Sequence, residues 1–316
     1  MSNANNELNG RITLWQRIRN LPVLLYIVLI LIIFLPGRMT YRIPIKDPKA
    51  FLTVITLIFA YFQFKLDRGN PRQAKDITFC VFAFFILWET LTTKLDKLPY
   101  IFVPAPENVF YVFPNQWNFI LMGIARSMFL LISGYLSSIF IGVSLGIAVG
   151  WIPRLREAIF PVVKAISTVP AIIYGPYIVA IMPTFTSASI VVVFCGTFFS
   201  TFMNMINHVG TIDTRIINTT KVLNVNTRSM LFKVILPYTL PRIINDMSVS
   251  LSISMMTLTV AEMIGASSGI GFFVRSSLAY ANYSQGIAGI FVIALIITIL
   301  QSFVTLLKKK LINWHY

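Results

Sequence analysis

Long apolar runs separated by short basic segments constrain this 316-residue chain more than any other feature. A helix that crosses the hydrocarbon core of a bilayer needs about 20 predominantly apolar residues. Runs of about that length recur along the whole sequence, at approximately 19–36, 50–65, 77–93, 121–151, 159–183, 187–207, 243–264 and 286–307. The sequence therefore predicts an all-α integral membrane protein that crosses the bilayer several times.

Charge supports the same fold class. Charged residues make up 12% of the chain, against about 25% in soluble domains. The net charge of +15 does not indicate nucleic-acid binding, because the basic residues lie in short segments between apolar runs, as the positive-inside rule expects. By that rule the link 153–157, the loop 208–241 and the C-terminal Lys308–Lys310 are predicted to be cytoplasmic.

Two of the runs carry residues with a clear packing meaning. Gly134, Gly142, Gly146 and Gly150 form a small-residue stripe in the run 121–151, and such stripes let helices approach closely in lipid. The run 159–183 contains Pro161, Pro170 and Pro176, which predicts a proline-broken span.

The loop 208–241 is the most informative polar segment. Residues 213–223 are predicted to form a short helix that breaks at 224–227, where Asn or Thr can cap a second helix. That second helix has an apolar stripe, and Pro237 is predicted to end it. The resulting helix-turn-helix elbow can dock into a groove of a cytoplasmic partner or pack on its own bundle, and the pattern alone leaves both open. Its apolar stripe consists of Met230, Leu231, Val234 and Ile235.

Two segments carry a resemblance to a known family. Residues 218–224 and 232–237 resemble the EAA loop of binding-protein-dependent ABC permeases, with Asn218 at the Glu position, Asn224 at the Gly position and Leu236-Pro237 at the expected distance. Thr219 and Thr220 stand at the two Ala positions. The segment 260–271, together with Trp88-Glu89 and 103–107, is similar to the nitrate/sulfonate/taurine/bicarbonate branch.

The resemblance covers about residues 78–316 and implies an architecture. It implies a six-span ABC permease core of the type I importer kind at 77–316, preceded by an N-terminal extension, 1–76, with two extra apolar segments. Both loops of the extension, 37–49 and 65–76, are basic, so two spans and a re-entrant hairpin both remain open. The implied location is the bacterial cytoplasmic (inner) membrane, with a multi-pass chain and a cytoplasmic C-terminus.

The resemblance also implies partners and a mechanism. The partners would be separate ABC ATPase subunits, a second permease copy, an external substrate-binding protein and the surrounding membrane lipid. The chain has no Gly-x-x-x-x-Gly-Lys-Ser/Thr motif, so it is expected to be no enzyme and to bind no cofactor, with ATP and Mg on the partner ATPase. The solute would be small and anionic or heterocyclic, moved by alternating access. The residues assigned to ATPase coupling are Asn218, Thr219, Thr220, Lys221, Leu223, Asn224, Leu231, Ile235, Leu236 and Pro237.

Carboxylates within apolar runs are costly and therefore functional candidates. Glu262, just before a Gly-rich turn, either lines the translocation path or outer gate, or accepts hydrogen bonds that fix the turn. Asp246 is expected to pair with Arg242, and Glu89 is expected at the membrane interface. His208 and His315 are isolated, so no metal site is predicted. The residues assigned to the path or gate are Glu262, Gly265, Ser267, Ser268, Gly269 and Gly271.

Two other functions compete with the importer. An ion-coupled secondary transporter would use Glu89, Asp246 and Glu262 and should show inverted repeats, but the sequence has no convincing repeat. A non-coupling structural subunit of a membrane complex would explain the departures of the elbow from the EAA pattern.

Overall fold

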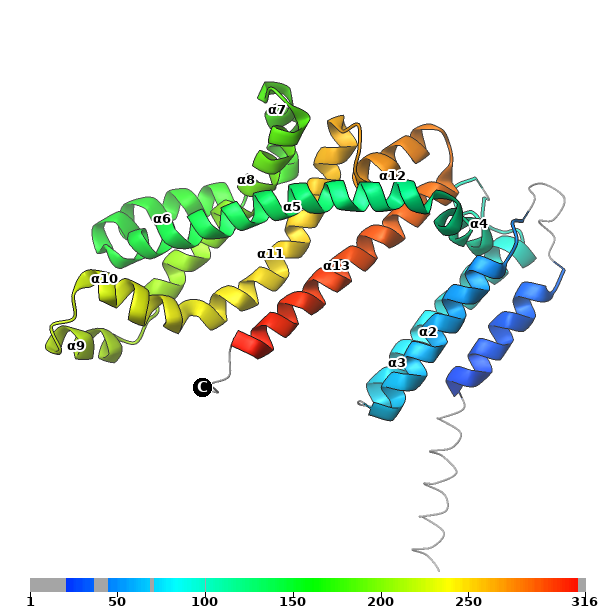
Figure 1. Ribbon diagram of the computed structural model, residues 1–316, viewed down its shortest axis with the longest axis horizontal. Coiled ribbons are helices and arrows are strands. Elements are labelled where there is room, and N and C mark those ends of the chain that lie inside the picture. The colour runs from blue at the N-terminus through cyan, green and yellow to red at the C-terminus, as the bar shows by residue number, and fades with distance from the viewer. Residues whose placement is uncertain (1–20, 37–44, 69–70, 100, 312–316) are drawn as a thin grey trace, which may run out of the picture. The chain divides into compact units, whose positions relative to one another are not determined.

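The structure is a computed structural model that describes residues 21–36, 45–68, 71–99 and 101–311. Every regular element in these ranges is a helix, as the apolar runs predict. The described chain forms two compact units, whose boundaries along the sequence fall inside α5 (Val112–Trp151), α12 (Ile270–Ala279) and α13 (Tyr283–Leu311) (Figure 1). The polar N-terminus, most of the loop 37–49 and His315 lie outside the described residues.

The first unit contains the described part of residues 1–118 together with Ser277–Ala288. It holds the Leu21–Phe34 helix, α2 (Lys49–Arg68), α3 (Pro71–Glu89), a π-helical turn (Thr90–Lys94) and α4 (Pro106–Phe110). Aromatic side chains join these elements. Tyr26 stacks on Phe59 at 4.4 Å between ring centroids, and the fully buried Phe51 stacks on Phe110 at 5.2 Å. The predicted division between residues 76 and 77 falls inside α3 of this unit.

The second unit contains residues 119–276 and 289–316 as far as they are described. It holds most of α5 (Val112–Trp151), then α6 (Pro153–Ser167), α7 (Ala171–Ile181), α8 (Phe185–Gly210), α9 (Thr214–Val222), α10 (Thr227–Ser229) and α11 (Leu236–Gly265). Most of α12 (Ile270–Ala279) and of α13 (Tyr283–Leu311) completes it. In Figure 1, α6 lies alongside α8, and α7 is bent away from α6 by 89° while still packing against α8.

Six segments of the described chain have the length and apolarity of a membrane span. Five are continuous: Gln73–Lys94, Val112–Trp151, Phe185–Gly210, Thr227–Gly265 and Tyr283–Lys310. The sixth is the pair α6 and α7, bent by 89° at residues 168–170. The predicted proline-broken span is thus broken before Pro170, which stands at the N-cap of α7. These six segments correspond to the six predicted core spans, while Leu21–Phe34 is shorter than a full span.

The glycine stripe of α5 faces α8, as the sequence predicts. A Cβ at Gly146 would lie 2.5 Å from Cβ of Met205, and a Cβ at Gly150 would lie 2.8 Å from Cβ of Val209. Real Cβ atoms do not approach so closely, so only glycine permits this separation of the two helices.

The predicted end of the elbow at Pro237 is wrong. The second elbow helix continues through a π-helical segment, Met230–Ile235, directly into α11. In that segment the backbone N–H of Leu236 donates to the carbonyl of Leu231, five residues back. Pro237 follows at the first turn of α11. The extra residue in the π turn changes the hydrogen-bond register before the proline, so the missing N–H of Pro237 does not end the helix.

Candidate functional site

The elbow between α8 and α11 has the local geometry that its sequence predicts. The backbone N–H of Arg215 donates to the carboxylate of Asp213 (2.8 Å) at the start of α9. After α9, Asn224 has a φ of +52°, a left-handed conformation that Asn tolerates better than most residues. Asn226 then caps α10, because its side-chain oxygen accepts from the N–H of Ser229 (2.8 Å).

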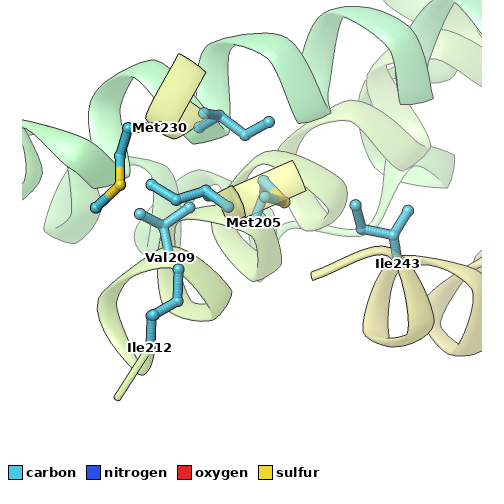
Figure 2. Packing of buried hydrophobic residues seen from close by; sticks show 7 residues of the cluster. Met205, Val209, Ile212, Met230 and Ile243 are labelled. Atoms are coloured by element: carbon cyan, nitrogen blue, oxygen red, sulfur yellow. The ribbon is translucent and has the colours of Figure 1, made fainter. Parts of the chain in front are cut away.

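One face of the elbow packs on the chain's own bundle. Met230 and Ile235 are buried in a cluster with Met205, Val209 and Ile243 (Figure 2). Ile147 of α5 and Ile212 belong to the same cluster, and Leu231, Val234 and Leu236 pack against it partly buried. The stripe of the second elbow helix therefore attaches the elbow to α5, α8 and α11. Ile235, assigned to coupling from the sequence, is fully buried in this conformation.

The opposite end of the elbow presents apolar side chains to solvent. Val222 is 83% exposed and Leu223 is 68% exposed, at the point where α9 ends. Asn218, Thr219, Asn224 and Pro237 are exposed as well, whereas the side chain of Lys221 lies outside the described residues. The structure thus places the assigned residues from Asn218 to Asn224 at the tip, and it places Leu231, Ile235 and Leu236 at a buried or partly buried base beside the exposed Pro237.

The two threonines at the Ala positions bond to their own helix. The Thr219 hydroxyl donates to the carbonyl of Arg215 (2.8 Å), and the Thr220 hydroxyl donates to the carbonyl of Ile217 (2.8 Å). These bonds satisfy the hydroxyl donors within α9, so the threonines replace alanines without disrupting the helix.

Glu262 forms a buried latch at the turn between α11 and α12. Ser127 of α5 donates its hydroxyl to Glu262 Oε1 (2.6 Å), and the N–H of Gly271 donates to Oε2 (2.7 Å). The N–H of Ile270 donates to the same Ser127 oxygen (2.9 Å). Glu262 is 1% exposed, and both carboxylate oxygens are engaged. This geometry matches the hydrogen-bond acceptor of the two alternatives that the sequence left open.

The turn itself requires glycine at the latch. Gly269 has a φ of +116°, and a Cβ there would lie 2.5 Å from the Glu262 carboxylate. A Cβ at Gly271 would lie 2.5 Å from the carbonyl oxygen of Thr259. Both glycines are buried, whereas Gly265, Ser267 and Ser268 are exposed. Of the residues assigned to a path or gate, the structure joins Glu262, Gly269 and Gly271 into one contact set.

The predicted pairing of Asp246 with Arg242 is wrong. Asp246 Oδ2 lies 2.8 Å from Nε2 of His208 on α8, while Arg242 donates to the Thr211 hydroxyl (2.8 Å) and lies over the ring of Tyr238. The carboxylate is directed to the neighbouring helix rather than along its own. His208 is therefore not isolated. Its partner could not be predicted from the sequence, because the two residues are 38 positions apart and lie on different helices.

Glu89 is buried within the protein and belongs to a charged cluster that the sequence did not reveal, while its expected place at the membrane interface stays a prediction. Glu89 is 0% exposed and Glu107 of α4 is 2% exposed. Lys94 Nζ lies 3.4 Å from Glu89 Oε1, and the Thr93 hydroxyl donates to the same oxygen (2.5 Å). Burial, and then the negative charge of Glu89, raise the pKa of Glu107 to about 8.

Lys94 also connects the extension to α3. Its ammonium donates to the backbone carbonyl of Leu35 (2.7 Å) and to that of Ile33 (3.4 Å). These carbonyls belong to the end of the Leu21–Phe34 helix, where the last carbonyls have no partner within the helix. The charged cluster therefore holds the end of the first helix.

No metal site is formed within the described residues: no group of three or more His, Cys, Asp or Glu side chains gathers there. The two described carboxylate sites, at Glu262 and at Glu89–Glu107, are supported by serine, backbone N–H, threonine and lysine donors.

Comparison with known proteins identifies the kind of chain. A family model described as "Binding-protein-dependent transport system inner membrane component" matches residues 138–313. The curated relative "Putative aliphatic sulfonates transport permease protein SsuC" of Bacillus subtilis is 29% identical over 182 residues, covering 58% of this chain and 66% of the relative. The taurine transport system permease protein TauC of Escherichia coli is 27% identical over 240 residues, covering 72% and 86%.

A solved structure has the same fold. An inward-facing structure of the MetNI methionine ABC transporter aligns with a TM-score of 0.56 at 18% identity, covering 63% of this chain and 99% of the aligned chain. The family match covers α8, the elbow, α11 and Glu262 with its Gly-rich turn, whereas Ser127 of the latch lies before the matched residues. The chain therefore belongs to the binding-protein-dependent transport system inner membrane component family, whose members are permease subunits of ABC transporters.

Proposed function

We propose that this chain is the membrane-spanning subunit of an ATP-driven importer and that the tip of its elbow is the docking site for a separate ATPase subunit. The observation that carries the proposal is the division of the elbow. Val222 and Leu223 are exposed at the tip, while Met230 and Ile235 fix the base in the core.

This division suits the transmission of force. A partner that moves the tip also moves the base, because the base is packed against α5, α8 and α11 in one cluster. Closely packed interiors transmit such displacements rather than absorbing them. The continuous helix from the π segment into α11 gives the movement a rigid path to the Glu262 latch at the other end of α11.

The proposed solute is a small anion. The supporting observation is that the relatives are named for aliphatic sulfonates, taurine and, in Leptolyngbya laminosa, nitrate. The proposed assembly contains two permease copies, two ATPase subunits that bind ATP and Mg, and an external binding protein. Lys308–Lys310, at the end of α13, support a cytoplasmic C-terminus.

Co-purification from membranes in mild detergent tests the docking site. The wild-type chain is expected to elute with a stoichiometric ATPase subunit, and Leu223→Asp is expected to lose it, because a carboxylate cannot be desolvated in an apolar cleft without a partner. Tyr280→Asp is the matched control, since Tyr280 is 86% exposed and lies far along the chain from the elbow. Retention of the ATPase by Leu223→Asp, or its absence from the wild-type preparation, would refute the proposal.

The same kind of substitution at the base of the elbow separates an effect on docking from an effect on folding. Ile235→Asp places a carboxylate in the core cluster and is expected to lower the yield of folded chain, whereas Leu223→Asp should leave the thermal unfolding midpoint unchanged.

An ion-driven transporter remains the competing function. It would show solute uptake into proteoliposomes that depends on an ion gradient and not on ATP.

A further inference from the structure

A polar pocket of about 300 Å³ lies within the first unit. Three chain segments form it: the extension just before α2, the stretch from α4 into α5, and the start of α13. The side chains that define its chemistry are Lys46, Asn108, Tyr111, Asn282, Ser284 and Gln285. Lys46 and the stretch 108–116 lie outside the residues that the family model matches.

The pocket presents cationic and neutral polar groups. Lys46 is a lining residue, and its ammonium lies 5.6 Å from the centroid of the Tyr111 ring. The other polar side chains of the lining are carboxamides and hydroxyls, and no Asp or Glu belongs to it. An ammonium beside neutral polar groups attracts anions and repels cations.

Hydrogen bonds within the protein determine which end of most lining carboxamides remains for a ligand. The N–H of Lys46 donates to Asn108 Oδ1 (2.9 Å), and the N–H of Gln285 donates to Asn282 Oδ1 (3.3 Å). A backbone N–H is always a donor, so these two side-chain oxygens are fixed as acceptors. The NH₂ groups of Asn108 and Asn282 are the ends that remain, and so is that of Gln285, whose Oε1 accepts from the Ser277 hydroxyl (3.5 Å). Asn115 is oriented the other way, because its NH₂ donates to the carbonyl of Tyr111 (2.6 Å). The pocket is therefore biased toward hydrogen-bond donation, which is the requirement of an oxyanion.

We infer that this pocket binds a small organic oxyanion of the sulfonate or carboxylate class, with Lys46 supplying the charge. The volume accommodates such a solute, because small-molecule sites begin at about 300 Å³. The inference rests on the proposed function for the side of the membrane that the pocket faces. The segments that form it stand at the N-terminal ends of α5 and α13, and the basic C-terminal end of α13 is assigned to the cytoplasm. The pocket then opens to the outside and gives the extension a part in receiving the solute.

Equilibrium binding to the purified full-length chain tests the pocket. The chain is placed in phosphatidylcholine nanodiscs without ATP or binding protein, and radiolabelled ethanesulfonate is the probe. Lys46→Gln is expected to weaken binding by about tenfold, because it removes the charge from a charge-assisted hydrogen bond. Lys49→Gln is the matched control, since Lys49 lies on the same segment, pairs with exposed Asp47 (2.9 Å) and does not line the pocket.

The charge preference supplies a second, independent readout. Gln285→Glu introduces a carboxylate into the lining and is expected to abolish ethanesulfonate binding, and ethylammonium is expected not to bind the wild-type chain. Equal affinities for Lys46→Gln and Lys49→Gln, or binding of ethylammonium as tight as that of ethanesulfonate, would overturn the inference. Both substituted lysines are exposed, so neither variant is expected to affect folding.

The phosphate of a lipid headgroup is an oxyanion as well. One further experiment distinguishes a headgroup from a small solute as the ligand of the pocket. Nanodiscs that contain phosphatidylglycerol are compared with those made of phosphatidylcholine alone. Competition by phosphatidylglycerol, with loss of co-purified phosphatidylglycerol in Lys46→Gln by native mass spectrometry, supports the oxyanion pocket and assigns it to a headgroup. No step of this assay requires an ATPase. A failure of ATPase co-purification therefore leaves the binding result intact, and a failure of binding leaves the docking proposal intact.

Discussion

Three buried carboxyl groups, those of Glu262, Glu89 and Glu107, are accommodated in two different ways. Glu262 has a donor for each oxygen, Ser127 for one and the Gly271 N–H for the other. Glu89 and Glu107 each keep one buried oxygen without a hydrogen-bond partner among the described residues. The sequence predicted an acceptor role for Glu262 as one alternative, but its partner Ser127 is 135 residues away. Pattern within a single helix cannot reveal a contact of that separation.

Replacing Glu107 by a residue that does not titrate is predicted to change how the stability of the chain depends on pH. Burial and the charge of Glu89 raise the pKa of Glu107 in the folded chain from 4.5 to about 8. The folded chain therefore keeps a proton that the unfolded chain releases above about pH 4.5. Stability should therefore fall as the pH rises from about 4.5 to about 8 and then level off. Glu107→Gln should remove this fall, giving a gain at pH 8 of several kcal/mol and at most about 5 kcal/mol, since each unit of pKa shift corresponds to about 1.4 kcal/mol.

Thermal unfolding midpoints in detergent at pH 5 and pH 8.5 provide the measurement. Glu157→Gln, which alters an exposed carboxylate on α6, should show the wild-type dependence. A wild-type midpoint that stays constant or rises over this range would contradict the assignment of a protonated Glu107.

At the scale of elements, the length of the apolar runs predicted the helices well, but it predicted the connections between consecutive helices poorly. The six runs of the core and the glycine stripe of α5 follow from composition and spacing, because burial of apolar surface and close helix contact act along one segment. The continuation of the elbow through a π-helical segment into α11 does not follow. It depends on a cluster that joins α5, α8 and the elbow, and this tertiary packing overrides the local stop signal of Pro237.

The close contact of α5 and α8 predicts that alanine substitutions at two of its glycines differ in how much they destabilise the chain. Gly146→Ala should destabilise the chain by about 1 to 3 kcal/mol, as overpacking does elsewhere, because the new Cβ would lie 2.5 Å from Cβ of Met205. Gly142→Ala is the internal comparison, since its Cβ would meet Thr201 at 3.2 Å. The thermal midpoint should fall more for Gly146→Ala than for Gly142→Ala, and the reverse order would show that the helix separation is set elsewhere.

At the scale of the whole molecule, the extension is built into the first unit. Resemblance separates residues 1–76 from the rest, but Phe51 of α2 packs on Phe85 and Phe110, and Lys94 holds the end of the Leu21–Phe34 helix. No sequence pattern indicates this attachment, because Lys94 stands at the end of an apolar run, where a lysine ordinarily reaches the membrane surface.

Lys94→Met is predicted to destabilise the first unit by about 3 to 5 kcal/mol, since breaking a buried ion pair leaves its partner charge uncompensated. The Lys94 side chain is 15% exposed and that of Glu89 is 0% exposed. Adding Glu89→Gln to Lys94→Met should recover part of the loss, which a double-mutant cycle of thermal midpoints measures. Lys97→Met, three residues along and exposed, should be neutral. An unchanged midpoint in Lys94→Met would mean that the cluster contributes nothing to attachment.

The bond from Lys94 to the carbonyl of Leu35 spans 59 residues, and this separation sets an order for biosynthesis. At about 5 to 20 residues per second, the ribosome adds Lys94 roughly 3 to 12 s after it has added Leu35. During that interval the short first helix has neither its lysine donor nor the aromatic surface of α3. We therefore expect the first helix to stay at the membrane insertion machinery until α3 has been synthesised, so that the two enter the bilayer together.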